Sequence, residues 1–177
     1  MVFLGTVSEG KRGLASDKQP ISVLLSTREE NRYPQFLCLD MVKSESAEWI
    51  APLIQERVKL GKERVLNTDG KKVYEVLKDE ITVHCEKVDY AKKDHRLFWL
   101  NTMISNLNSV IVGIYHGIAK KDLYLFLQEF SWRTNHRCSG ATIMQKVHAY
   151  IADSAVMTNK QIMRYVETIY PFIAKLA

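Results

Sequence analysis

The sequence predicts an α/β fold, built on a mixed sheet whose first three strands are antiparallel, with helices on its faces and at its C-terminal end. Two observations lead to this prediction. Stretches rich in β-branched and aliphatic residues, separated by polar loops, dominate the N-terminal part of the chain. The spacing of apolar residues then changes to three and four, which is typical of amphipathic helices, over much of the remaining chain.

Three strands are expected first, at residues 2–7, 20–27 and 35–42. The polar segments 8–19 and 28–34 connect them. Consecutive strands with such connections are typical of an antiparallel meander. The first three strands are therefore expected to pair in chain order.

Helices and two more strands follow. Ser46 can cap a helix that runs to about residue 60, where Gly61 ends it. The later elements are expected at 64–68 (strand), 71–78 (helix), 81–88 (strand), and 97–113, 120–134, 139–152 and 158–175 (helices). The order β-β-β-α-β-α-β-α, followed by further helices, is the RNase H-like arrangement.

The composition is that of a globular protein with a basic surface. The chain has 177 residues, enough for one domain with a substantial core, and its net charge of +5 favours a polyanionic partner without proving one. Its 3 cysteines are far apart, which argues against a zinc ribbon or a disulfide framework. No apolar run is long enough for a signal peptide or a membrane span, so we expect a cytoplasmic protein with no membrane partner.

One carboxylate follows a predicted strand directly. Asp69 lies in Thr68-Asp69-Gly70, where the strand at 64–68 ends. Side chains at strand ends can point into a crevice of an α/β sheet, and Mg²⁺ and Mn²⁺ prefer oxygen ligands. Asp-Gly is also a common turn dipeptide. The pattern alone leaves both interpretations open.

A polar stripe marks the helix predicted at 97–113. Asn101, Ser105 and Asn108 are spaced at i, i+4 and i+7, so they share one face of this helix. The face is either part of a site or simply the solvent-exposed side of an amphipathic helix. Basic pairs along the chain have the same two interpretations, as backbone phosphate contacts or as solvated surface. The candidates for DNA contact are Lys11, Arg12, Lys71, Lys72, Lys120, Lys121, Arg133 and Arg137.

The segment Leu100–Arg137, together with Thr68-Asp69-Gly70 and Tyr74, resembles the catalytic domain of DDE-type insertion-sequence transposases of the ISXO-like branch. The shared features are the apolar helix, the Tyr115-His116-Gly117 break and the basic–aromatic run at 130–137. The resemblance implies metal-dependent cleavage and strand transfer of DNA at insertion-sequence ends. It also implies Mg²⁺ or Mn²⁺ as cofactor, double-stranded DNA as partner, a second copy of the chain as a further candidate partner, and nucleoid association. It implies no small-molecule substrate.

The resemblance also assigns site residues. Asp69 corresponds to the second catalytic and metal-binding Asp, and Asn101, twelve residues before Gly113, to the third such residue. The family most often has Glu at the position of Asn101, and Asn or His in some branches. Asn108 stands where the family commonly has Lys.

The first catalytic Asp of the family would precede the matching segment Val2-Phe3-Leu4-Gly5 by two residues, one residue before Met1. We therefore expect an N-terminally truncated, catalytically incomplete domain at residues 1–138, with 139–177 as its helical extension. One alternative is a non-catalytic RNase H-like remnant that binds DNA or a protein. Another is an unrelated α/β domain with no role in nucleic-acid chemistry.

Overall fold

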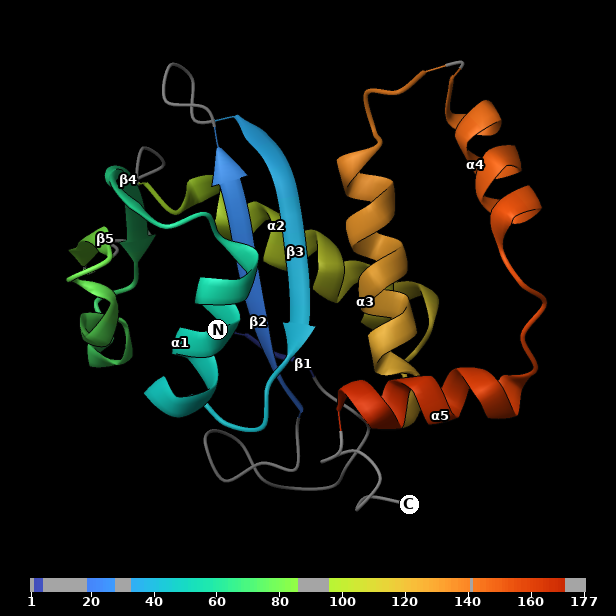
Figure 1. The fold of residues 1–177 in the computed structure, drawn as a ribbon, viewed down its shortest axis with the longest axis horizontal. Helices are drawn as coiled ribbons and strands as arrows, with labels where there is room; N and C mark the ends of the chain where they lie inside the picture. The colour runs from blue at the N-terminus through green and yellow to red at the C-terminus, as the bar shows by residue number, and fades with distance from the viewer. Residues whose placement is uncertain (1, 5–18, 28–32, 86–95, 141, 171–177) are drawn as a thin grey trace.

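The computed structural model describes residues 2–4, 19–27, 33–85, 96–140 and 142–170. The predicted order of elements is confirmed within these ranges (Figure 1). The strands are β1 (Val2–Leu4), β2 (Gln19–Thr27), β3 (Pro34–Met41), β4 (Gly61–Thr68) and β5 (Ile81–Cys85). The helices are α1 (Ala47–Arg57), the 3₁₀ helix η1 (Lys72–Leu77), α2 (Phe98–Asn108), the π-helix η2 (Ser109–Ile114), α3 (Lys120–Asn135), α4 (Thr142–Asp153) and α5 (Asn159–Ile169).

The strands form two sheets rather than the single mixed sheet that the sequence predicts. The first three strands pair antiparallel in the order β1-β2-β3, as expected, with Ile21 opposite Met41. β4 and β5 pair parallel in a separate sheet. Within the described residues, β1 is only three residues long, and no ladder joins it to β4. Among the residues that the structure describes, the two sheets are therefore separate.

Two hydrophobic clusters hold the elements together. The larger joins the β1-β2-β3 sheet to α2, η2, α3 and α5, and its fully buried members include Ile21, Leu127 and Val166. The smaller packs Ile50 and Ile54 of α1 against β5 and the end of η1. Figure 1 shows α1 in front of the sheet and α2 behind it. The sheet is thus covered on both faces, which is typical of a layered α/β fold.

Side chains of α3 satisfy the free edge of β3. The Asn135 side chain accepts a hydrogen bond from the Leu37 backbone amide (2.7 Å) and donates one to the Leu37 carbonyl (2.9 Å). The Gln128 amide donates to the carbonyl of Leu39 at 3.0 Å. Exposed strand edges invite pairing with other chains, and covering an edge with a helix removes that risk. α3 therefore terminates the sheet on this side.

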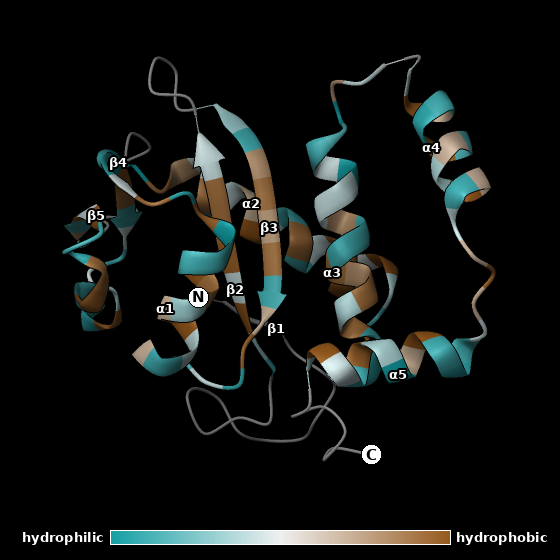
Figure 2. Ribbon diagram, viewed as in Figure 1, coloured by the Kyte–Doolittle hydropathy of each residue, from teal (hydrophilic) through white to brown (hydrophobic). Residues whose placement is uncertain are grey.

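The two C-terminal helices differ in how they pack. α5 begins with a capping box between Thr158 and Gln161, and it places Val166 in the larger cluster. α4 has no buried residue, and its described contact with the core is an edge-on approach of Tyr150 to Trp132 with ring centroids 6.4 Å apart. Figure 2 shows apolar and polar residues alternating around α4, which stands apart from α3. Among the described helices, none is both long and apolar enough to span a bilayer.

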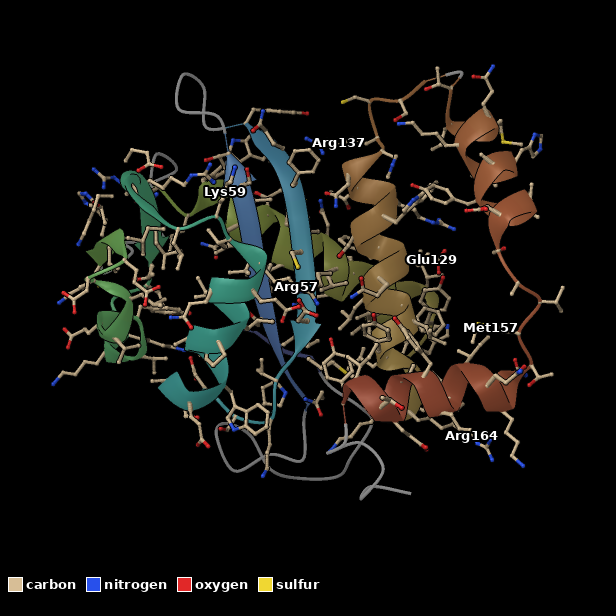
Figure 3. All side chains as sticks on the ribbon, in the orientation of Figure 1. Arg57, Lys59, Glu129, Arg137, Met157 and Arg164 are labelled. Carbon is tan, nitrogen blue, oxygen red and sulfur yellow. The ribbon has the colours of Figure 1, made fainter. Side chains whose placement is uncertain are left out.

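A buried carboxylate links β3, α1 and the end of α5. Asp40, whose side chain is 3% exposed, accepts a hydrogen bond from the Tyr170 hydroxyl at 2.7 Å and pairs with Arg57 Nε at 3.3 Å. Figure 3 shows Arg57 beside β3. Burial and the neighbouring Asp40 raise the pKa of the Cys38 thiol to about 12. Burial and the same carboxylate raise the pKa of Tyr170. Both groups are therefore neutral at physiological pH.

We expect the free energy of unfolding to fall as the pH rises from about 9 to 12. Cys38 and Tyr170 have raised pKa values in the folded chain, so the folded state binds protons that the unfolded state loses above the ordinary values of 9.0 and 10.0. The stabilisation they provide is complete below pH 9 and disappears as the pH rises through the folded values. Urea unfolding at pH 8, 9, 10 and 10.5 measures this fall. Tyr170→Phe should make it shallower, and a constant free energy across this range would contradict the prediction.

Candidate functional site

Asp69 lies at a tight turn directly after β4. Thr68, the last residue of the strand, is buried, and its hydroxyl donates to Cys85 Sγ of β5 at 3.5 Å. Gly70 has a φ of +85°, a left-handed conformation that glycine adopts without strain. The chain reverses at this glycine, so the side chains on either side of it, Asp69 and Lys71, approach each other. Asp-Gly is thus both a turn and the position of the predicted site carboxylate.

The partner of Asp69 is a lysine. Lys71 Nζ lies 3.6 Å from Asp69 Oδ2 and also donates to Glu45 Oε1 in the turn before α1. The side chains of Glu45, Asp69 and Lys71 are 12%, 31% and 39% exposed, so the ammonium is partly covered between two carboxylates. Burial lowers the pKa of Lys71, but the contacts with Glu45 and Asp69 outweigh this effect and raise it overall. The lysine is therefore charged at neutral pH.

Tyr74, which the resemblance associates with Asp69, faces the same cluster. Burial raises its pKa to about 12, and the nearby charges of Asp69 and Glu45 contribute. The phenol stays protonated at neutral pH and packs against the smaller hydrophobic cluster. At neutral pH the ring of Tyr74 therefore adds no charge beside the two carboxylates.

Asn101 lies in an open groove on the surface of α2 and η2. The groove has a volume of about 610 Å³ and is lined by Asn101, Ile104, Ser105, Asn108, Ser109, Val112 and Gly113. The three polar residues that the sequence places on one helical face therefore line one groove. The Nδ2 atom of Asn101 is buried without a hydrogen-bond partner among the described residues. A buried amide donor without a partner is costly, so it is a candidate for ligand contact.

The π-helix η2 shapes the far end of this groove. Ser109 follows the last residue of α2, and its hydroxyl donates to the Ser105 carbonyl at 2.9 Å. A π-helical turn adds a residue per turn, and such turns occur frequently at functional sites. A Cβ at Gly113 would meet no atom within 4 Å, so the groove is open there. The helix expected at 97–113 thus changes from an α-helix to a π-helix after Asn108, where the polar stripe ends.

The start of α2 is tied to the sheet that carries Asp69. The Arg96 guanidinium, two residues before α2, hydrogen-bonds to His84 Nδ1 of β5 at 2.9 Å and to Asn67 Oδ1 of β4 at 3.5 Å. Asn101 and Asp69 therefore belong to adjoining segments. Among the described residues, the Asn101 side chain donates no hydrogen bond to Asp69, since its amide nitrogen has no partner. The described partner of Asp69 is Lys71.

The predicted DNA-contact residues fall into three groups. Lys11 and Arg12 lie outside the described residues. Lys72, Lys120 and Lys121 begin η1 and α3, and Lys72 and Lys121 are exposed. The remaining side chains make contacts within the protein, as described for Lys71 above and for the two arginines below.

Arg133 and Arg137 are held by contacts along and beside α3. Arg133 pairs with Glu129 one turn earlier at 2.6 Å. Arg137 donates to the carbonyls of Pro34 and Thr134, and it lies over the Tyr33 ring at 5.3 Å from its centroid. Figure 3 shows Arg137 at the C-terminal end of α3. Part of the basic–aromatic run at 130–137 therefore has a structural role, because Arg137 joins α3 to the start of β3.

The described residues do not fit a divalent metal ion as they are arranged. They contain no group of three His, Cys, Asp or Glu side chains placed to hold one. Asp69 faces the ammonium of Lys71, and Asn101 is a neutral ligand at best. Two-metal sites rely on carboxylates that bridge the ions. The arrangement therefore does not provide the ligand set that the resemblance implies.

The comparison with protein families decides the assignment. The model of the ISXO2-like transposase domain matches residues 4–135 of this chain. The chain belongs to this transposase family. Membership implies a role in DNA transposition and binding to DNA, and transposases of the DDE type generally use divalent metal ions. The chain matches no curated protein and no solved structure. The helices α4 and α5 lie beyond the matched residues.

Two long-range contacts in this transposase domain were not predicted from the sequence. Glu45 lies in a polar turn and pairs with Lys71 across 26 positions of the chain. Asn135 lies within the basic–aromatic run and pairs with β3 across 98 positions. Local spacing does not encode such contacts. For Asn135, the one hint was an amide side chain at the end of an amphipathic helix.

Proposed function

We propose that this transposase domain binds a DNA strand along the groove of α2 and η2, beside Asn101. The observation that carries the proposal is the open groove itself, about 610 Å³ in volume, in which two asparagines and two serines lie beside Ile104, Val112 and Gly113. Amide and hydroxyl groups donate hydrogen bonds to phosphate and sugar oxygens without reading sequence. Ser105 and Ser109 are exposed in this groove and can supply such donors, whereas the amide nitrogen of Asn101 is buried.

Two lysines at the start of α3 are proposed to extend this surface. Lys120 and Lys121 begin α3, and residues 115–119 connect this helix to the end of η2. Phosphate contacts by lysine release condensed counterions and make binding salt-dependent. In this proposal the groove supplies neutral contacts and the lysines supply electrostatic attraction. Residues 1–138 form the DNA-binding unit, and residues 139–177 are its helical extension.

The fold is proposed to be RNase H-like. β2 lies between β1 and β3, so one edge of β1 is free, and β4 is likewise paired on one side, by β5. Pairing between β1 and β4 would join the two sheets into one mixed sheet of the expected kind. Cross-strand contacts between these two strands in a solution NMR structure would establish that arrangement.

Catalysis is proposed to be incomplete in this arrangement. Asp69 and Asn101 are the catalytic and metal-binding candidates, but Asp69 is ion-paired with Lys71, and Asn101 carries no charge. Phosphoryl transfer depends on positioned metal ions and their electrostatics. We therefore favour DNA binding over strand cleavage by this chain alone. Cleavage of supercoiled DNA in Mn²⁺, abolished by Asp69→Ala, would instead favour the catalytic alternative.

Duplex DNA binding measured over a series of salt concentrations tests the proposed interface. Lys120→Gln with Lys121→Gln should lower the magnitude of the salt slope by about 1 for each phosphate that a lysine no longer neutralises. Asn108→Ala should lower the affinity about fivefold, the effect of one hydrogen bond of about 1 kcal/mol, and leave the slope unchanged. The salt slope thus distinguishes the two kinds of contact, because loss of a charged contact changes it and loss of a neutral contact does not.

Lys160→Gln on α5 is the matched control for the lysine variants, because Lys160 is exposed and lies outside the matched family domain. It should leave both affinity and slope close to those of the unchanged protein. An equal reduction of the slope in this control would mean that the attraction comes from net charge rather than from the proposed surface. No measurable DNA binding by the unchanged protein would contradict the proposed function itself.

A further inference from the structure

Lys71 is the described ion-pair partner of Asp69. Its ammonium contacts Glu45 Oε1 and lies 3.6 Å from Asp69 Oδ2. The two carboxylates come from separate parts of the chain, the turn before α1 and the turn after β4. Their convergence on one cation is a feature of the tertiary structure, not of local sequence.

The geometry holds this cluster in place. The left-handed turn at Gly70 brings Lys71 back toward Asp69, and Glu45 is largely covered by its surroundings. Two carboxylates face one ammonium, so the cluster carries one uncompensated negative charge. Partly buried charges are screened less than exposed ones. The cluster therefore attracts a cation, but its carboxylate oxygens already contact the ammonium of Lys71.

We propose that Lys71 is a built-in counter-ion that keeps divalent metal ions off Asp69 until a DNA phosphate draws the lysine away. This inference rests on the proposed function, in which Asp69 is a metal-ligand candidate and DNA is the partner. An ammonium and a divalent ion that contact the same carboxylate are close together, so they repel each other. A phosphate carries the same sign of charge as the carboxylates, so a bound strand competes with them for Lys71.

The neighbouring lysine shows that this arrangement is specific to Lys71. Lys72 is exposed at the start of η1, and it forms no ion pair with the residues that the structure describes. It carries the same charge and lies one residue away. Lys72 is thus a matched control, because its substitution removes a positive charge near Asp69 and leaves the Lys71 contact intact.

Direct measurement of Mn²⁺ binding, from the electron paramagnetic resonance signal of free Mn²⁺, tests the proposal without any catalytic readout. Lys71→Met should bind Mn²⁺ at least about tenfold more tightly than the unchanged protein, because a cation repelling the metal is removed. Lys72→Met should bind it as the unchanged protein does. Adding Asp69→Asn to Lys71→Met should abolish the gain, and circular dichroism checks that each variant is folded.

Duplex DNA provides the second arm of the experiment. It should strengthen Mn²⁺ binding to the unchanged protein and have little further effect on Lys71→Met. A folded Lys71→Met that gains no Mn²⁺ affinity would overturn the proposal. The proposal would also be overturned if the unchanged protein bound Mn²⁺ without DNA and Asp69→Asn abolished that binding. This result is decisive even if Lys71→Met does not fold. Failure of the unchanged protein to bind DNA contradicts the proposed function. Comparing Mn²⁺ binding by the unchanged protein and by Lys71→Met without DNA still tests the role of Lys71 as counter-ion.

Discussion

Leu127→Ala is expected to lower the free energy of unfolding by about 2–5 kcal/mol. Leu127 is 0% exposed and lies where α3 meets β3 within the larger hydrophobic cluster. Truncation to alanine removes buried methyl groups and leaves a cavity that the surrounding sheet and helices fill only partly. Because α3 also supplies the hydrogen bonds that cover the edge of β3, the substitution should loosen both elements. Urea unfolding monitored by tryptophan fluorescence measures the change.

Leu125→Ala on the same helix is the matched control. Leu125 is 38% exposed and lies two residues away, so the same side chain is truncated on the same helix at an exposed position. The substitution should change the free energy of unfolding by no more than about 1 kcal/mol, since little buried surface is removed. Equal effects at the two positions would mean that α3 does not pack against β3 as described.

Asp40→Ala is expected to destabilise the chain by about 2–4 kcal/mol. The substitution removes the acceptor of the buried Tyr170 hydroxyl and the partner of Arg57. The hydroxyl then loses its hydrogen bond to Asp40 in a covered position, whereas Arg57, 42% exposed, can still reach water. Most of the cost should therefore come from the contact with Tyr170 at the end of α5. Urea unfolding gives the total change.

Hydrogen exchange locates the effect of Asp40→Ala. The backbone amides of α5 should exchange faster, because the hydrogen bond between Tyr170 and β3 is removed. Tyr170→Phe removes the hydroxyl and should cost less, about 1 kcal/mol, since Asp40 keeps its ion pair with Arg57 and no buried hydroxyl is left without a partner. If α5 exchanged at the same rate in Asp40→Ala as in the unchanged protein, the proposed role of Asp40 in holding this helix would be wrong.

The sequence predicted two local features around the candidate site residues, and the structure has both. The spacing of Asn101, Ser105 and Asn108 predicted one shared face, and these residues line one groove. The dipeptide Asp69-Gly70 predicted a turn at the end of a strand, and Gly70 adopts the left-handed conformation that such a turn uses. Both features depend on neighbouring residues. Helical periodicity and glycine conformational freedom are local properties, so the sequence expresses them directly.

The contacts of the charged residues were decided only by the tertiary structure. Lys71 and Arg137 were both predicted to contact DNA, but the fold places them against Glu45 and the carbonyl of Pro34. These partners lie 26 and 103 positions away. A charged side chain in a sequence gives no indication of which distant group it meets. Whether DNA displaces either contact stays a prediction.

By itself, the sequence determined the order of strands and helices and the transposase family, because strand and helix periodicities, turn residues and family motifs are carried by residues close together in the chain. The tertiary structure decided which elements meet. Among the described residues, β4 and β5 pair apart from the first sheet, α5 docks through Val166, and α4, also amphipathic, has no buried residue. Amphipathic spacing shows that a helix has an apolar face, but only packing in three dimensions determines whether another surface covers it.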